Sequence, residues 1–210
     1  MAIGECACAS VHGANRLGTN SLIDLIVFGR AAAKKASELI KPGSPLRPYR
    51  EGCADFSLER LDRLRYSKGL FKTSDIRLKM QRTMQNNAAV FRTTDVLKEG
   101  CKEIVEVWNQ FSDINVSDNS LIWNTDLVES LELENLIINA ATTMYSAESR
   151  HESRGAHAHE NFPKRDDKNW MKHSLAYFQK SGEVKINYRP VHTHTLTDEV
   201  QYIEPRARVY

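Results

Sequence analysis

Residues 10–22 read SVHGANRLGTNSL, and Gly4-Glu5 stand shortly before them. This stretch combines small residues with one imidazole, one guanidinium and a nearby carboxylate. An apolar helix is expected to follow, because residues 22–33 read LIDLIVFGRAAA and residues 19–21 are favourable helix N-caps. The first N–H groups of a helix lack acceptors within it, and its dipole favours negative charge there. The pattern predicts a loop that binds an anionic ligand beside a cofactor; the alternative is a simple tight turn.

The composition excludes several classes of protein. Of 210 residues, 41% are hydrophobic, which is enough for a packed core and argues against wholesale disorder. Lys and Arg number 29 and Asp and Glu 27, so the net charge of +2 gives no reason to expect nucleic acid or an anionic membrane as a partner. No apolar run reaches the roughly 18–20 residues that span a bilayer, and the first residues do not resemble a signal peptide.

The sequence has four cysteines: Cys6, Cys8, Cys53 and Cys101. No two of them form a CxxC pair, and no histidine stands at a spacing typical of a zinc site. They indicate reduced thiols in a reducing compartment. Alternatively, Cys6 and Cys8 could be two ligands of a metal ion. Their alternation with Ala7 and Ala9 instead favours a buried strand that leads into the loop. Residues 1–3 resemble the end of such a strand. We therefore expect an internal Met1 and the C-terminal part of a longer protein.

The pattern of prolines, glycines and apolar residues predicts four regions. Residues 1–41 should form strand, loop and helix, and the Pro- and Gly-containing stretch 42–52 should be a linker. Apolar residues at helical spacing over 53–150 predict an antiparallel bundle of four amphipathic helices, with caps at 73–75, 93–95 and 124–126. Methionines and tryptophans at this spacing are expected in the core rather than around a cofactor.

The last region, residues 151–210, should contain a β-hairpin. Residues 172–178 and 183–189 alternate apolar and polar side chains around Ser181-Gly182. The histidines near residues 151–159 could bind a metal, but interlocked ion pairs or a docking surface fit the pattern better. The tail 191–210 is polar and is expected to lie over another surface. The predicted class is α+β, mainly α.

Four segments resemble the succinate dehydrogenase and fumarate reductase flavoprotein family: HGANRLGTNSLIDLIVFGRAAA (12–33), VFRTTDVLKEG (90–100), SLIWNTDLVESLELENL (120–136) and MYSAESRHESRGAH (144–157). The first is also similar to a segment of L-aspartate oxidases, but RDDKNWMKHSL (165–175) argues against them. His159 stands where the family usually has arginine, which puts in doubt any ion pair at that position. The resemblance extends over the whole chain but only over the last third or so of the family's length.

The resemblance implies particular site residues. Residues 1–41 would be the end of an FAD-binding domain, in which Glu5 binds FAD hydroxyls and the backbone of Ser21 and Leu22 binds the flavin. Arg16 would bind a carboxylate of succinate or fumarate, which suits its planar, permanently charged fork. We assign His12 no catalytic role and expect no metal ligand and no catalytic residue in this chain. The family's proton-accepting arginine and flavin-linked histidine lie upstream of the matched residues.

The resemblance also implies a reaction and partners. Succinate would be oxidised to fumarate with hydride transfer to FAD, and electrons would pass to an iron–sulfur subunit and a quinone. The complex would sit on the inner membrane through anchor subunits, facing the cytoplasm in a bacterium or the matrix in a mitochondrion. Two alternatives stay open: a fumarate reductase working in the opposite direction, and a stand-alone helical module that docks an iron–sulfur partner.

Overall fold

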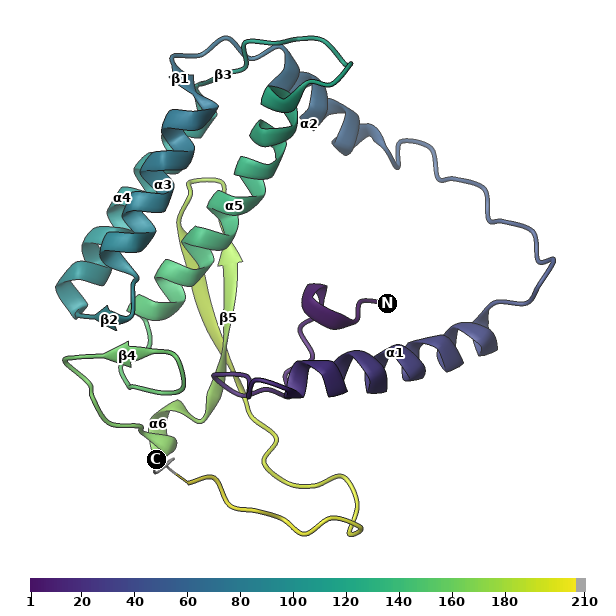
Figure 1. The fold of residues 1–210 in the computed structure, drawn as a ribbon, viewed down its shortest axis with the longest axis vertical. Helices are drawn as coiled ribbons and strands as arrows, with labels where there is room; N and C mark the ends of the chain where they lie inside the picture. Colours follow the sequence, from purple (N-terminus) through teal and green to yellow (C-terminus); the bar gives the residue numbers. More distant parts are fainter. Residues whose placement is uncertain (207–210) are drawn as a thin grey trace. The chain divides into compact units, whose positions relative to one another are not determined.

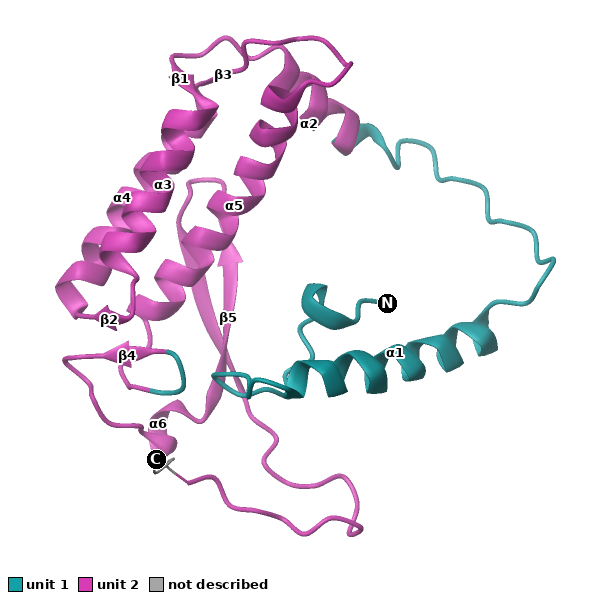
Figure 2. Cartoon of the chain, viewed as in Figure 1, with its two compact units in different colours: residues 1–56, 154–156 teal, residues 57–153, 157–210 magenta. Residues whose placement is uncertain are grey.

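The computed structural model describes residues 1–206 and divides the chain into two compact units, coloured separately in Figure 2. The first unit comprises residues 1–56 together with 154–156. The second comprises residues 57–153 and the chain from 157 onward. The mainly helical α+β class predicted from the sequence is confirmed. None of the helices within the described residues is both long and apolar enough to cross a bilayer.

The first unit contains a 3₁₀ turn, η1 (Gly4–Cys6), and a long helix, α1 (Asn20–Leu39) (Figure 1). The helix begins where the sequence predicts and ends just before Pro42-Gly43. The strand expected within residues 1–9 is wrong: this stretch holds η1 and no strand. A strand needs a neighbour for its backbone N–H and C=O groups, and residues 1–9 pair with no other strand among the described residues.

Four helices form most of the second unit: α2 (Asp55–Arg65), whose first turn contains the boundary between the units, α3 (Thr73–Asn87), α4 (Thr94–Ser112) and α5 (Thr125–Glu148). Figure 1 shows α3, α4 and α5 running in alternating directions, as expected of an antiparallel bundle. Their apolar faces meet in a core that includes Leu64, Ile76, Met80, Ile104, Phe111, Leu133, Ile137 and Met144. The methionines at helical spacing are thus core residues.

The helix caps were predicted correctly at two of four starts. Thr93 accepts a hydrogen bond from the Val96 N–H, and the Asn124 side chain accepts one from the Leu127 N–H. The other two differ, since α1 follows Thr19 and α3 follows Lys72, each without a side-chain cap. The Thr73 hydroxyl does not cap its own helix. It lies within hydrogen-bonding distance of the side chains of Asp126 and Ser130 on α5.

Short strands tie both ends of the bundle. At one end β1 (Phe71–Lys72) pairs in parallel with β3 (Ile114–Asn115), and at the other β2 (Phe91–Arg92) pairs in parallel with β4 (Ala158–His159). A two-residue strand carries no periodicity, so the sequence pattern could not reveal these pairings.

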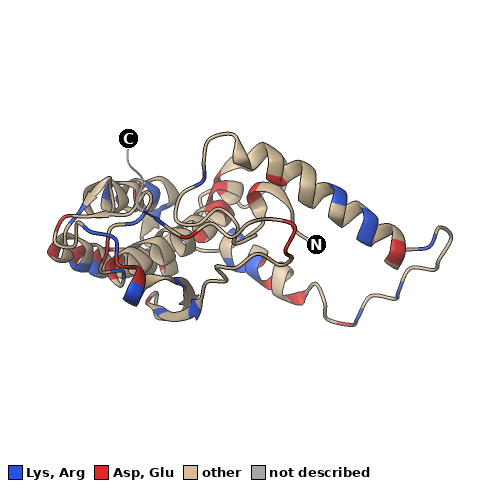
Figure 3. Ribbon diagram, turned by 90° about the horizontal axis from the view of Figure 1, so that it is seen from below, with Lys and Arg blue, Asp and Glu red and all other residues tan. Residues whose placement is uncertain are grey.

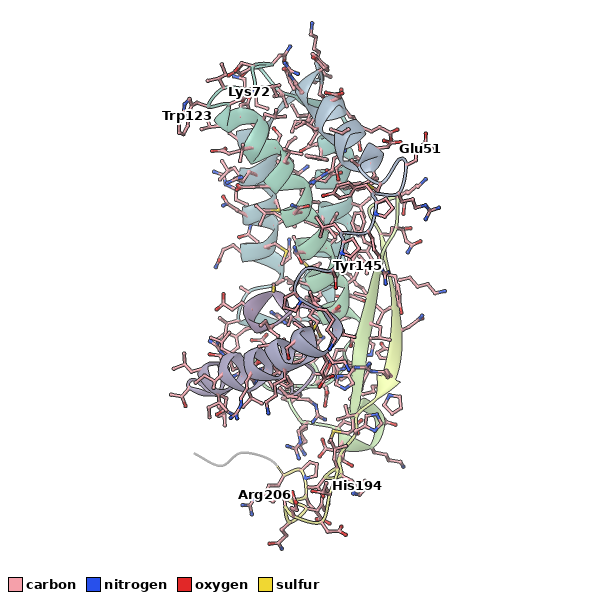
Figure 4. All side chains as sticks on the ribbon, turned by 90° about the vertical axis from the view of Figure 1, so that its right-hand side faces the viewer. Glu51, Lys72, Trp123, Tyr145, His194 and Arg206 are labelled. Atoms are coloured by element: carbon pink, nitrogen blue, oxygen red, sulfur yellow. The ribbon has the colours of Figure 1, made fainter. Side chains whose placement is uncertain are left out.

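The predicted β-hairpin is confirmed to within one residue. Strand β5 (Lys172–Phe178) follows the short helix α6 (Asp167–Trp170) and pairs antiparallel with β6 (Val184–Pro190). Both strands pack against α5, close to Tyr145, which is labelled in Figure 4. Burial is the largest cause that raises the pKa of Tyr145 to about 12.

A buried polar network holds the irregular segment between α5 and the hairpin. Arg150 donates to Glu152 Oε1 at 2.6 Å and to the carbonyl oxygens of Trp170 and Lys172 at 3.1 and 2.7 Å. Glu152 is fully buried and also accepts from the Asp166 N–H at 3.0 Å. The expected ion pairing in this segment is thus present between Arg150 and Glu152, and the alternative of a docking surface stays a prediction.

Candidate ligand-binding loop

The loop before α1 is fixed to that helix by one side-chain pair. His12 Nε2 lies 2.7 Å from Asp24 Oδ2, and the two side chains are 27% and 12% exposed. Asp24 was not among the predicted site residues, although a charge inside the otherwise apolar run of residues 22–28 was a usable signal. The pair clamps the start of the loop onto the second turn of the helix.

The 3₁₀ turn η1 lies close against α1 and requires its glycine. Gly4 has a φ of +75°, and a Cβ at this position would lie 2.7 Å from Leu25 Cδ2. Glycine alone meets both demands without strain. Glu5 follows directly and is exposed, so the predicted FAD-binding carboxylate is presented from a turn packed on α1.

The first turn of α1 presents the unused backbone N–H of Ser21. The Asn20 N–H donates to the Leu17 carbonyl at 3.0 Å, and the Leu22 N–H donates to the Thr19 carbonyl at 3.1 Å. Thr19, the N-cap, makes no side-chain bond to this turn. Within residues 1–206 the Ser21 N–H has no acceptor, so it is available to a ligand, whereas the Leu22 N–H is already engaged.

Arg16 lies between the His12 clamp and the helix start. It is exposed and pairs with no acidic group among the described residues. Glu5, Arg16, Ser21 and Leu22 thus all belong to the first compact unit, on η1, the loop and the first turn of α1. A free guanidinium on a loop clamped at one end is suited to bind a carboxylate through two hydrogen bonds.

Helix α1 itself buries no residue within the described part of the chain. Five successive or nearly successive apolar side chains are 45–72% exposed: Leu22, Ile23, Leu25, Ile26 and Val27. Figure 3 shows this half of the helix largely without charge. By sequence, Lys34, Lys35 and Glu38 belong to its other half. Contiguous exposed apolar surface of this kind marks an interaction face.

Three histidines of the second unit, His151, His157 and His159, form a cluster of rings. The centroid of the His159 ring lies 5.8 Å from that of His157 and 6.4 Å from that of His151. Arg92 can only donate, so His157 Nδ1 accepts its bond at 2.8 Å and Nε2–H donates to the Arg150 carbonyl at 2.9 Å. Among the described residues no group of three metal-binding side chains gathers.

Burial lowers the pKa of both His157 and His159, which favours their neutral forms. His159 is only 1% exposed, and neither of its ring nitrogens has a hydrogen-bond partner within the described residues. Among residues 1–206 the His159 imidazole therefore forms no ion pair.

Comparisons with known proteins agree on one family. The family described as fumarate reductase flavoprotein C-term matches residues 77–210. The mitochondrial succinate dehydrogenase (ubiquinone) flavoprotein subunit of Oryza sativa subsp. japonica is 58% identical over 210 residues, which are the whole chain and 33% of that relative. The fumarate reductase flavoprotein subunit of Haemophilus influenzae is 35% identical over 211 aligned positions, which span the whole chain and 34% of that relative.

A solved structure shares the fold. A chain of Escherichia coli quinol fumarate reductase matches with a TM-score of 0.83 and 33% identity, covering 96% of this chain and 35% of that one. The chain thus spans about a third of the length of the relatives it matches. Its residues belong to the succinate dehydrogenase and fumarate reductase flavoprotein family of oxidoreductases and correspond to the C-terminal part of those flavoproteins.

Proposed function

We propose that this chain acts as the C-terminal third of a succinate dehydrogenase flavoprotein, which oxidises succinate to fumarate with FAD as cofactor. One observation carries the proposal: an exposed, unpaired Arg16 stands on a loop that the His12–Asp24 pair clamps to α1. A guanidinium so placed pays little entropy on binding a carboxylate, because its supporting backbone is already ordered.

Oxidation of succinate requires a group that holds a carboxylate while hydrogen leaves the adjacent carbons. Arg16 supplies two parallel N–H donors and a permanent positive charge, which orient a dicarboxylate and offset its negative charge. The other carboxylate contacts and the group that accepts the proton are assigned to residues upstream of this chain. Arg16 is therefore a substrate-binding residue, and no proton transfer is assigned to it.

The residues at the start of α1 suit part of an FAD site. The free Ser21 N–H and the positive end of the helix dipole favour an electron-rich acceptor, and the exposed Glu5 can accept bonds from hydroxyl groups. The Leu22 N–H already donates to the Thr19 carbonyl, so it can bind the flavin only through a hydrogen bond shared between both acceptors. When bound, the flavin supplies the hydride acceptor. The exposed apolar face of α1 would be covered by the remainder of the FAD-binding domain.

Partners and location follow from the same proposal. Electrons would leave through an iron–sulfur subunit to a quinone, and membrane anchor subunits would hold the complex on the inner membrane. The side would be the matrix in a mitochondrion or the cytoplasm in a bacterium. Identity of 58% to a succinate dehydrogenase subunit, against 35% to a fumarate reductase subunit, favours the oxidative direction.

The test compares two proteins. One is the chain alone, and the other, called here the complete flavoprotein, joins the chain to the upstream two thirds of the rice relative. With added FAD, the chain alone should stay colourless and inactive, because Glu5, Ser21 and Leu22 supply only a few contacts to a large ligand. The complete flavoprotein should retain flavin that succinate reduces. Stoichiometric flavin and turnover in the chain alone would contradict the proposal.

A further inference from the structure

A tripeptide from the second half of the sequence belongs to the first compact unit. Residues 154–156 group with residues 1–56, and Figure 2 shows them in the colour of the first unit. Gly155 has a φ of +60°, and a Cβ built there would lie 2.7 Å from the Ala14 carbonyl carbon and 2.8 Å from its oxygen. Real Cβ atoms essentially never approach backbone this closely, so a side chain at 155 would require the Ala14 peptide to move.

Hydrogen bonds fix the chain on both sides of this tripeptide. The Ser153 hydroxyl donates to the Phe162 carbonyl at 2.8 Å and accepts from the His159 N–H at 2.8 Å. His157 accepts from Arg92 and donates to the Arg150 carbonyl, as described above. The residues that flank the tripeptide are therefore each held by hydrogen bonds within the second unit.

We propose that Gly155 is a positioning residue for Arg16: its missing side chain lets the loop approach closely enough to place the guanidinium for a dicarboxylate. This inference rests on the proposed function. Ala14 precedes Arg16 by two residues, and the His12–Asp24 pair clamps the loop on its other side. If the Ala14 peptide is displaced, the His12 side of the loop cannot move with it. The displacement therefore moves the backbone of Arg16.

Two other glycines with positive φ in the first unit show that a left-handed backbone does not by itself imply a close contact. Gly13 and Gly43 have φ values of +64° and +77°, yet a Cβ at either would meet no atom within 4 Å. Gly155 combines a left-handed backbone with direct approach to another backbone. Asparagine tolerates left-handed backbone better than alanine but carries the same Cβ. Replacing Gly155 by Asn therefore reduces the backbone strain but keeps the steric clash with Ala14, so comparing Asn with Ala separates the two effects.

The experiment uses the complete flavoprotein and three variants: Gly155→Ala, Gly155→Asn and Gly43→Ala. Succinate binding is measured by calorimetry, and hydrogen exchange of residues 10–19 is followed by mass spectrometry. Misplacement of a positioning group by about 1 Å can cost on the order of 100-fold. Both Gly155 variants should weaken succinate binding by about 10- to 100-fold and speed exchange in the loop, whereas Gly43→Ala should change neither.

Each result decides something. Wild-type affinity and exchange in the Gly155 variants would overturn the inference and leave the proposed function standing. Recovery by Gly155→Asn alone would overturn it too, because backbone strain would then explain the loss. If Gly155→Ala yields no folded protein, Gly155→Asn carries the comparison. A wild-type flavoprotein that binds no succinate would overturn the proposed function and, with it, this inference.

Discussion

Replacing Arg150 by methionine should destabilise the second unit severely. The Arg150 side chain is 15% exposed, and Glu152 is fully buried 2.6 Å away. Removal of one partner of a buried ion pair costs about 3–5 kcal/mol. Glu152 keeps the Asp166 N–H as a partner, so we expect the lower end, about 3 kcal/mol. At roughly 2–4 °C per kcal/mol for a chain of this size, the midpoint of thermal unfolding should fall by about 6–12 °C.

The assays are thermal unfolding and urea unfolding of the chain, both followed by circular dichroism. Lys102→Met is the matched control, because its pair with Glu99 is an exposed one, with side chains 72% and 55% exposed. The control should leave the urea midpoint unchanged within error. Adding Glu152→Gln to Arg150→Met should recover part of the loss, since no unpaired charge is then buried. Equal midpoints for Arg150→Met and Lys102→Met would refute the assignment of Arg150 as the holder of this segment.

Two further predictions concern the linker and the response to acid. Limited proteolysis should cut residues 42–52 before the bundle, because prolines and glycines there disfavour regular structure; equal protection of both would count against a boundary. Burial is the largest cause that lowers the pKa of His157, His159 and His173. Their neutral forms favour the folded state, so stability should be full above about pH 6.5 and fall as the pH decreases below it. Urea midpoints at about pH 7.5 and pH 5 should differ, and His157→Gln should reduce that difference; an unchanged difference would exclude His157 as a contributor.

Features governed by local sequence were predictable. The caps at Thr93 and Asn124 need only one side chain and a backbone N–H three residues on, and the hairpin needs only alternation around Ser181-Gly182. The loop before α1 was located by its small residues and the apolar helix that follows. In each case the atoms that decide the structure lie within a few residues of one another.

Features governed by distant partners were not predictable. The expected strand in residues 1–9 depended on neighbours that the described chain does not provide. Thr73 bonds to α5 rather than to its own helix, and the approach of Gly155 to Ala14 joins segments far apart in the sequence. The His12–Asp24 pair was hidden because its carboxylate appeared only as an interruption of an apolar run.

The role of Arg16 is tested most directly by Arg16→Lys in the complete flavoprotein, with Arg47→Lys in the predicted linker as control. Lysine keeps the charge but loses the planar fork, and one hydrogen bond to a charged group is worth roughly 1.5–3 kcal/mol. We therefore expect kcat/KM for succinate to fall about 10- to 100-fold with flavin content unchanged. The control should match the wild type. Wild-type oxidation of succinate by the Arg16→Lys flavoprotein would show that Arg16 does not bind the substrate carboxylate.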